Sequence, residues 1–401
     1  MTSTPTNVYF ARALRDFGDG FVALLLPVYL AARGFNAFEV GLVASLALFG
    51  SALTTLGIGV IGARFGQRVL LIAASALMAA TGIAFAFSNV AALIFLVAFM
   101  GTINPTAGSV SIFVPLEHAL LAHASPDKER TKIFARYSLI GALAAAAGAL
   151  AAGSTEILSL AGLTPLEAMQ LMFVFYAGLG VAGGAFYFRI PREADVAQTA
   201  AAKPLGPSRA IVVKLAALFA VDSFAGGFVV QSLLALWLFD KFGLSLAEAG
   251  IFFLVAGLLG AVSLPVAGWL GARFGLINTM VWTHIPANLA LIGAALAPTL
   301  ESALALLLLR SLLSQMDVPA RSSYVMAVVT PEERTAAASF TAVPRSLASA
   351  ISPALAGALF AAGYTALPLI ICGVVKTAYD LALLWTFRNV KPPEEMRARG
   401  A

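Results

Sequence analysis

The sequence predicts an all-α integral membrane protein with twelve transmembrane helices in two six-helix halves. First, 60% of the 401 residues are hydrophobic and only 11% are charged, against roughly 25% charged residues in ordinary soluble domains. Second, the apolar residues form runs near the roughly 20 residues that a helix needs to cross a bilayer. Third, the runs are apolar all round, whereas the strands of a membrane β-barrel alternate polar and apolar residues. The composition therefore excludes a soluble enzyme.

The apolar runs place the expected helices along the chain. At about 33 residues per helix and loop, the chain has room for twelve crossings. In order, the expected helices span about residues 8–31, 37–61, 69–88, 91–118, 131–153, 167–189, 210–239, 245–271, 276–297, 302–327, 333–362 and 365–387.

The first helix has an alternative interpretation as a secretory signal, because residues 20–32 form a short apolar run that ends in small residues. Arg12, Arg15, Asp16 and Asp19 precede that run at helical spacing. Acidic residues are unusual before the apolar core of a signal peptide. We therefore favour a first membrane helix.

The basic residues orient the protein in the membrane. With a cytoplasmic N-terminus, the inner loops and the C-terminal tail hold fifteen Lys and Arg residues, whereas the outer loops hold only Arg33 and Lys241. Such a bias places both termini in the cytoplasm. The net charge of +5 thus reflects orientation and does not indicate a nucleic-acid partner. We expect a multi-pass protein of the cell inner (plasma) membrane.

One long polar interruption divides the chain. Residues 190–209 contain three prolines and several charged residues in an Ala-rich stretch, a composition typical of a linker. The expected organisation is an N-terminal six-helix half (1–189), a cytoplasmic linker (190–209), a C-terminal six-helix half (210–388) and a cytoplasmic tail (389–401).

The two halves also resemble each other in sequence. Gly59 to Gly66 recurs 209 residues later as Gly268 to Gly275, with Gly-x-x-Gly-Ala-Arg-Phe-Gly in both copies. The same offset relates Gly34, Glu39 and Gly41 to their second-half counterparts Gly243, Glu248 and Gly250. Several matches at one offset indicate a duplicated six-helix unit, as in transporters whose halves rock about a central site.

The glycine-rich segment between helices 2 and 3 carries a family resemblance. The run through Arg64, Gly66 and Arg68 is similar to the Gly-x-x-x-Asp-Arg-x-Gly-Arg-Arg motif of the major facilitator superfamily. With the two halves and the central loop, the chain resembles that family over nearly its whole length. The resemblance implies cytoplasmic gating contacts, for which Arg64, Arg68, Arg273 and Asp19 are the candidates. Ala63 departs from the motif, because the family usually has Asp there.

A second signature of the family, Gly-Pro-x-x-Gly-Gly in helix 5, is typical of drug antiporters. The fifth expected helix holds glycines and many alanines but no proline. This departure disfavours a multidrug antiporter.

Charged residues inside the expected helices are the candidate functional residues, because a charge near the bilayer centre costs about 2.5–3.5 kcal/mol on insertion scales. In helix 1, Arg12, Arg15, Asp16 and Asp19 share one face. They form either two local pairs, Arg12 with Asp16 and Arg15 with Asp19, or a gate or proton site centred on Asp16 or Asp19. In helix 7, Asp222 has no basic residue nearby in sequence and is the better proton carrier.

Helices 10 to 12 supply the remaining charged candidates of the second half. Arg310 and Asp317 belong to one polar stripe of helix 10, which we expect to face the bundle interior. Arg345 lies about 18 Å into helix 11, near mid-membrane. It contacts either an anionic substrate or an acid such as Asp317 or Asp380, and its planar fork suits carboxylate or phosphate. In helix 12, Lys376 pairs most simply with Asp380.

Three further residues complete the candidate substrate contacts. Asn104 lies in the middle of helix 4 beside a proline, and Gln231 lies within helix 7. Arg136, early in helix 5, either faces the cavity or reaches cytoplasmic phosphates.

The sequence indicates no cofactor and no metal. It lacks a Gly-x-x-x-x-Gly-Lys-Ser/Thr loop, so transport would run on an ion gradient or downhill. One cysteine, Cys372, excludes a disulfide framework, and three histidines make a histidine metal cluster improbable.

These observations favour a monomeric secondary active transporter, not an enzyme, that works by alternating access. The leading hypothesis is proton-coupled movement of a small organic or phosphorylated anion, with Arg345 and Arg310 as anion contacts and Asp222 or Asp16 as the proton-bearing acid. Two alternatives remain. One is export of an amphiphilic or cationic compound bound by Asp222 and Asp317, and the other is a non-transporting membrane sensor with the same fold.

Overall fold

A computed structural model describes residues 4–61, 65–107, 111–124, 129–191 and 205–390. These residues form helices and connecting turns with no strand, which confirms the all-α class. The chain forms two compact units. Unit 1 comprises residues 1–199, 230–257 and 353–361, and unit 2 comprises residues 200–229, 258–352 and 362–401.

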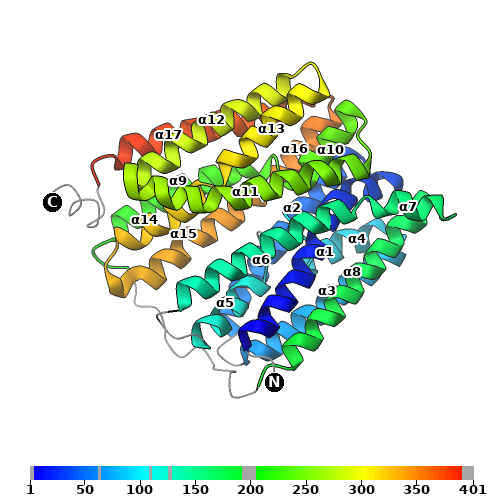
Figure 1. Cartoon of the computed structure of the whole chain (residues 1–401), viewed down its shortest axis with the longest axis horizontal. Coiled ribbons are helices and arrows are strands. Elements are labelled where there is room, and N and C mark those ends of the chain that lie inside the picture. Colours follow the sequence, from blue (N-terminus) through cyan, green and yellow to red (C-terminus); the bar gives the residue numbers. More distant parts are fainter. Residues whose placement is uncertain (1–3, 62–64, 108–110, 125–128, 192–204, 391–401) are drawn as a thin grey trace. The chain divides into compact units, whose positions relative to one another are not determined.

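Unit 1 contains the helices of the first half of the sequence and parts of the second. α1 packs along both α6 and α8, and α3 packs along α8 (Figure 1). The helices are α1 (Thr4–Ala32), α2 (Ala37–Ile61), α3 (Gln67–Phe87), α4 (Ala91–Met100), α5 (Phe113–His123), α6 (Arg130–Ala151), α7 (Ser154–Leu160), α8 (Pro165–Phe188), α10 (Gln231–Phe242), the start of α11 (Leu246–Phe274) and nearly all of α16 (Ser352–Ala361).

Unit 2 holds the remaining helices. α9 packs along α15 and α17, and α12 contacts α13, α14 and α17. Leu215, Phe219, Met280 and Leu383 belong to its buried core. The helices are α9 (Arg209–Gly227), the rest of α11, α12 (Leu276–Leu296), α13 (Leu300–Ser314), α14 (Asp317–Ala327), α15 (Arg334–Ser349) and α17 (Leu367–Phe387), with a short 3₁₀ turn at Pro331–Glu333.

Nine segments within the described residues are long and apolar enough to cross a membrane. The first, fourth and eleventh expected helices are not among them. α1 carries four charged residues, whereas the fourth and eleventh are each interrupted, as α4 and α5 and as α15 and α16. The number twelve therefore stays a prediction.

Prolines account for several helix interruptions. α13 ends at Ser314 and α14 begins at Asp317, where Pro319 has no N–H for the carbonyl of residue 315. α15 ends at Ser349, and Pro353 lacks the N–H that would bond to that residue's carbonyl. α4 and α5 flank Pro105. Irregular backbone at membrane depth is tolerated where protein buries it or where it lines a cavity.

The sequence repeat has structural counterparts where α2 and α11 begin. Gly34 and Gly243 both adopt left-handed backbone angles, with φ of 85° and 68°, which a residue with a Cβ rarely adopts. Reciprocal capping boxes then start the two helices. Asn36 and Glu39 bond each other's backbone amides at 3.0 and 2.8 Å, and Ser245 and Glu248 do so at 3.2 and 2.8 Å. The repeated residues therefore perform the same local task in both copies.

The next repeated pair of glycines makes close helix contacts within unit 1. A Cβ added at Gly41 would lie 2.9 Å from Cα of Gly357 on α16, and one at Gly250 would lie 2.7 Å from the Ala149 carbonyl oxygen on α6. The amide of Ala354 also donates to Ser45 at 2.8 Å. Small residues let helix backbones approach this closely. Segments from the second half of the sequence thus pack directly on helices of the first.

Gly50 on α2 offers a test of backbone packing in unit 1. Its added Cβ would lie 1.6 Å from the Phe99 carbonyl oxygen on α4, so we expect Gly50→Ala to force the helices apart. Overpacking of this kind costs about 1–3 kcal/mol or more, and the apparent Tm of the purified protein should fall clearly. Gly57→Ala, one heptad along α2, is the control, because nothing lies within 4 Å of its added Cβ. Equal Tm values for the two variants would contradict the close contact.

Candidate functional site

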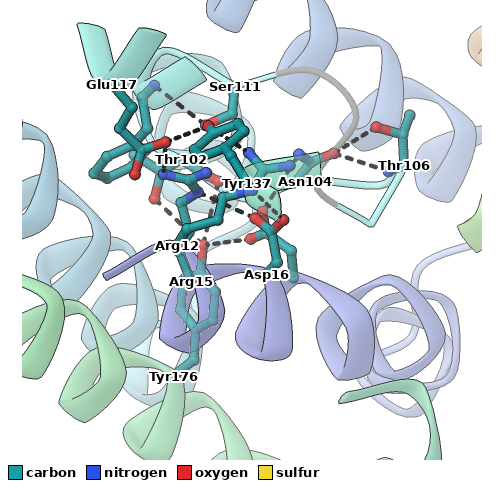
Figure 2. Close-up of polar contacts among 12 residues, drawn as sticks. Arg12, Arg15, Asp16, Thr102, Asn104, Thr106, Ser111, Glu117, Tyr137 and Tyr176 are labelled. Carbon is teal, nitrogen blue, oxygen red and sulfur yellow. Dashed lines mark hydrogen bonds and ion pairs between the residues drawn. The ribbon is translucent and has the colours of Figure 1, made fainter. Parts of the chain in front are cut away.

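The charged face of α1 lies buried inside unit 1 (Figure 2). Nε of Arg12 lies 2.6 Å from Oδ2 of Asp16, which confirms the expected local pair. Gly141 on α6 leaves room for this pair, because a Cβ there would lie 2.5 Å from both atoms. The expected pair of Arg15 with Asp19 is wrong. Arg15 instead contacts Asp16 at 3.3 Å and Glu117 at 2.9 Å.

Glu117 on α5 is the partner that sequence reasoning missed. It is fully buried, and it accepts hydrogen bonds at 2.5 Å from the hydroxyls of Tyr137 and Tyr187 as well as the ion pair with Arg15. Tyr137 in turn accepts a bond of 3.0 Å from Arg12. A buried carboxylate with three partners is well stabilised. The cluster of Arg12, Arg15, Asp16 and Glu117, here called the α1 cluster, is therefore neutral by charge count.

Asp19 lies one turn further along α1 and is 1% exposed. Its partners are neutral: the Tyr176 hydroxyl lies 3.3 Å from Oδ1 and the Asn104 amide nitrogen lies 3.4 Å from Oδ2. The Tyr176 hydroxyl also lies 3.2 Å from the Thr102 carbonyl oxygen, and it has one proton to donate. Within the described part of the chain, no Lys, Arg or His nitrogen forms an ion pair with Asp19. A buried carboxyl group with long, neutral contacts is suited to carrying a proton.

Asn104 lies in the interruption between α4 and α5. Its side-chain oxygen accepts hydrogen bonds from the amide and hydroxyl of Thr106, at 2.9 and 2.7 Å. The neighbouring carbonyl of Pro105 accepts a bond of 3.1 Å from the amide of Ser232, at the start of α10. The interrupted fourth helix thus connects Asp19 to the interrupted seventh helix within unit 1.

A second ion network lies in unit 2, around Asp222 on α9. Arg321 lies 3.2 Å and Lys376 lies 2.5 Å from its two carboxylate oxygens. Arg321 also contacts Asp317 at 3.1 Å. This set of four residues, here called the α9 network, holds two positive and two negative charges. Asp222 has no basic neighbour in sequence, but α14 and α17 bring two such residues to it in space.

The expected pair of Lys376 with Asp380 is not formed. Asp380 is 0% exposed, and it lies 3.0 Å from Nδ1 of His284 and 2.9 Å from the side-chain nitrogen of Asn288. α12 and α17 pack together and place these three residues side by side. His284 and Asn288 therefore contact the acid that the sequence paired with Lys376.

Arg345 and Arg310 take part in none of the ion pairs described above. Nε of Arg345 donates to the Ser223 hydroxyl at 3.2 Å, and Ser223 follows Asp222 on α9. Both arginines are partly exposed. Among the residues that the structure describes, neither arginine has a carboxylate within ion-pair distance. The structural pair of Arg345 with Asp317 or Asp380, weighed as an alternative, is absent from the described contacts.

The other candidates lie in varied surroundings. Arg136 is exposed on α6, and Gln231 is the first residue of α10. Arg68 is buried, and it donates to the Phe188 carbonyl oxygen at 2.8 Å. Arg273 is exposed and lies over the rings of Trp269 and Phe274. Arg64 lies outside the described residues.

Glu333 links the segment before α9 to the turn before α15. It accepts hydrogen bonds from the Gly206 amide and, at 2.9 Å, from the Thr330 hydroxyl. The bonds from Ser208 and Gly206 lower the pKa of Glu333 from its ordinary 4.5 to about 2. The ionised form thus stabilises the fold fully above pH 4.5, and this contribution fades as the pH falls towards 2.

We expect Glu333→Gln to lower the apparent Tm at pH 7, and the difference from wild type to shrink at pH 3. Glu332→Gln is the matched control, because Glu332 is the exposed neighbour in the same turn. A Tm deficit that is the same at both pH values would show that the charge of Glu333 contributes nothing.

Comparisons with known proteins agree with the all-helical membrane fold. A sequence model described as Major Facilitator Superfamily matches residues 8–316. An uncharacterized membrane protein of Saccharomyces cerevisiae, YJR124C, is 24% identical over 94% of this chain and 92% of its own length.

Solved structures resemble the whole fold at low sequence identity. The xylose transporter XylE from E. coli, inward open, has a TM-score of 0.74 at 13% identity, and covers 98% of this chain and 99% of that one. A bacterial homolog of the human lysosomal transporter Spinster, inward-facing and unoccupied, has a TM-score of 0.73 at 16% identity, with 96% and 97% covered. The nucleoside transporter NupG has a TM-score of 0.73 at 16% identity, and the match covers 96% of this chain and 100% of that one. At these identities the likeness shows the fold alone.

Proposed function

The chain belongs to the Major Facilitator Superfamily, and from this premise we propose that it is a secondary active transporter that moves a small organic or phosphorylated anion in exchange for, or together with, protons. One observation carries the choice of an anion: Arg345 and Arg310 lie in helices of unit 2 with no carboxylate partner among the described residues. An uncompensated guanidinium inside a membrane protein is costly. An anionic substrate would supply the missing charge.

The proton carrier that we propose is Asp19. The sequence favoured Asp16 and Asp222 as proton carriers. Each of these acids forms ion pairs with two basic side chains, and an ion pair favours the ionised form of a carboxylate. Asp19 has neutral partners. Protonation would remove its charge without breaking an ion pair, which is the change a carrier needs before it crosses the bilayer.

We further propose that the halves before and after residues 190–209 are the bodies that rock in alternating access. Gly41 with Gly357, and Gly250 with Ala149, join segments of the two halves within unit 1. Such contacts must open and close as the halves move. The fifteen basic residues of the inner loops support a plasma-membrane or inner-membrane protein with cytoplasmic termini. The proposed working form is a monomer.

The cation-export alternative has weaker support. It needs Asp222 and Asp317 to bind a cationic substrate, yet Lys376 and Arg321 already occupy these acids. A cationic substrate would have to displace both.

The test is a flux assay in proteoliposomes with radiolabelled small carboxylates, phosphate esters and lipophilic cations, each with and without an imposed pH gradient. The proposal expects accumulation of an anion that rises with the gradient and collapses with a protonophore. Uptake of cations alone would favour the exporter, and specific binding without any flux would favour the sensor.

A further inference from the structure

We propose that the Tyr176 hydroxyl is a positioning group that passes the protonation of Asp19 to the interrupted fourth helix. This inference rests on the proposed function, in which Asp19 carries the proton, and it adds how the rest of unit 1 senses that proton. Tyr176 keeps its own proton throughout. It turns this proton from Asp19 on α1 to the segment between α4 and α5 when Asp19 becomes protonated.

The first step is the fixed place of Tyr176. This residue of α8 is fully buried and reaches α1 (Figure 2), and its hydroxyl lies 3.3 Å from Oδ1 of Asp19. Its ring packs on Gly18, where an added Cβ would lie 2.9 Å from Cδ2 of the ring. The ring of Phe21 meets it edge-on, with 6.4 Å between the centroids. These contacts hold the hydroxyl oxygen beside Asp19, so that the direction of its O–H bond is what can change.

The second step is a count of donors and acceptors. The Tyr176 hydroxyl has one proton, and two acceptors compete for it: Oδ1 of Asp19 at 3.3 Å and the carbonyl oxygen of Thr102 at 3.2 Å. The Thr102 hydroxyl lies further away, at 3.4 Å. Hydrogen bonds from a hydroxyl to an oxygen are usually about 2.5–3.0 Å long. Neither contact is therefore a short, settled bond, and the charge of Asp19 decides which of the two forms.

The third step is the effect of a proton on Asp19. When Asp19 is ionised, its charged carboxylate is the stronger acceptor, and the Tyr176 proton points to it. The Asn104 amide nitrogen faces Oδ2 at 3.4 Å, so an incoming proton fits Oδ1, the oxygen that faces Tyr176. A protonated carboxyl group is itself a donor. Oδ1 then donates to the Tyr176 oxygen, and the Tyr176 proton turns to the Thr102 carbonyl.

The fourth step is the place of that carbonyl in the chain. Thr102 lies in the break between the end of α4 and the start of α5. In a continuous helix its carbonyl would accept a bond from the amide of residue 106, but the Thr106 amide donates to a side-chain oxygen at 2.9 Å. Within the same break, the Pro105 carbonyl accepts a bond from Ser232 at the start of α10. A bond from Tyr176 to Thr102 thus ties α8 to a segment that meets the second half of the sequence.

The fifth step is the other charged and titratable groups on the helices packed against α1. The α1 cluster pairs its four charges within itself and accepts tyrosine hydroxyl bonds from α6 and α8. On α5, His118 packs on aromatic rings of α6, and the basic residues of α6 lie in its first two turns. The acidic residues of α2 and α8 belong to the capping boxes of those helices, and α10 carries Asp240 and Lys241 in its last turn. Among the described contacts, Tyr176 is thus the titratable side chain that hydrogen-bonds Asp19.

The main experiment needs no substrate. Hydrogen–deuterium exchange of the purified protein is followed by mass spectrometry over a range of pH, for peptides that cover residues 101–107, and is corrected for the intrinsic pH dependence of exchange. In wild type, we expect exchange of this segment to slow at least about 3-fold when Asp19 takes up its proton, because one hydrogen bond to the segment is then added.

Two variants assign this change to the pair of residues. Tyr176→Phe keeps the ring on Gly18 and removes the hydroxyl, so the pH-dependent slowing should disappear while the apparent Tm stays near wild type. Asp19→Asn cannot take up the proton, and the slowing should disappear there too. Tyr9→Phe is the matched control, because it removes from α1 a hydroxyl that donates to the Ile133 carbonyl oxygen at 3.1 Å. This control should keep the wild-type change.

The outcomes separate this inference from the function on which it rests. Wild-type exchange that does not depend on pH, or a pH-dependent slowing that survives in either variant, would overturn the role of Tyr176. A clearly lower Tm of Tyr176→Phe would show that the hydroxyl holds the fold, and would also overturn it. Asp19 would remain the proposed carrier in these cases if Asp19→Asn loses pH-driven uptake of radiolabelled carboxylates and phosphate esters. Uptake that survives in Asp19→Asn would instead overturn the proposed carrier itself.

Discussion

Arg345→Ala should abolish transport while the protein still inserts and folds. The guanidinium of Arg345 lacks an acidic partner among the described residues, and its hydrogen bond goes to the neutral Ser223. Its removal therefore breaks no ion pair of the α9 network. Truncating one partner of a buried, hydrogen-bonded charge pair costs about 2–5 kcal/mol of binding, so we expect initial uptake at low substrate concentration to fall at least about 30-fold.

The measurement is initial-rate uptake in proteoliposomes that contain equal amounts of purified wild type and variant. Size-exclusion profile and apparent Tm, which should stay near wild type, show that insertion and folding are intact. Lys214→Ala serves as the control for loss of a cation in the same unit, because Lys214 is exposed on α9. Full transport by Arg345→Ala would eliminate the proposed role of this residue.

Asp19→Asn and Asp16→Asn should fail in opposite ways, although the two acids lie one turn apart on α1. Asn at position 19 keeps the shape of the side chain and its neutral contacts with Tyr176 and Asn104. It removes only the group that binds a proton. We expect accumulation driven by a pH gradient to fall at least 10-fold, whereas downhill movement and Tm are retained.

Asp16→Asn instead removes the carboxylate that holds Arg12 and Arg15. Breaking a buried ion pair from one side costs about 3–5 kcal/mol, so this variant should be recovered in low yield with a clearly lower Tm. The two variants are compared by Tm, by counterflow exchange and by pH-driven uptake. Wild-type coupling in Asp19→Asn would exclude Asp19 as the carrier and return attention to Asp16 and Asp222.

The fold and the local pair of Arg12 with Asp16 could be predicted from the sequence. The apolar runs follow from composition, and the i, i+4 spacing of Arg12 and Asp16 concerns neighbouring residues. The offset of 209 residues is found by comparing the sequence with itself. The structure confirms the all-helical class and that local pair. The repeated glycines and caps also perform matching local roles in α2 and α11.

The ion-pair partners of the buried charged residues could not be predicted from the sequence. Glu117 meets Arg15 from about 100 residues away, and Lys376 passes over Asp380, four residues on, to reach Asp222. Helical spacing shows which residues share a face, but the direction of that face depends on tertiary packing. One clue was available in each case, because an acid in an apolar helix with no basic neighbour must find a partner elsewhere.

In the rocking motion that we propose for the two halves, the glycine contacts of α2 with α16 and of α11 with α6 also bear on the speed of the transport cycle. Surfaces of glycine, alanine and bare backbone slide apart without disengaging interlocked side chains, and the described bond from Ala354 to Ser45 can be replaced by water. We therefore expect a low kinetic barrier to their separation, and the same surfaces can meet again in the same register. Larger side chains there would hold the contact more firmly and would slow every turnover.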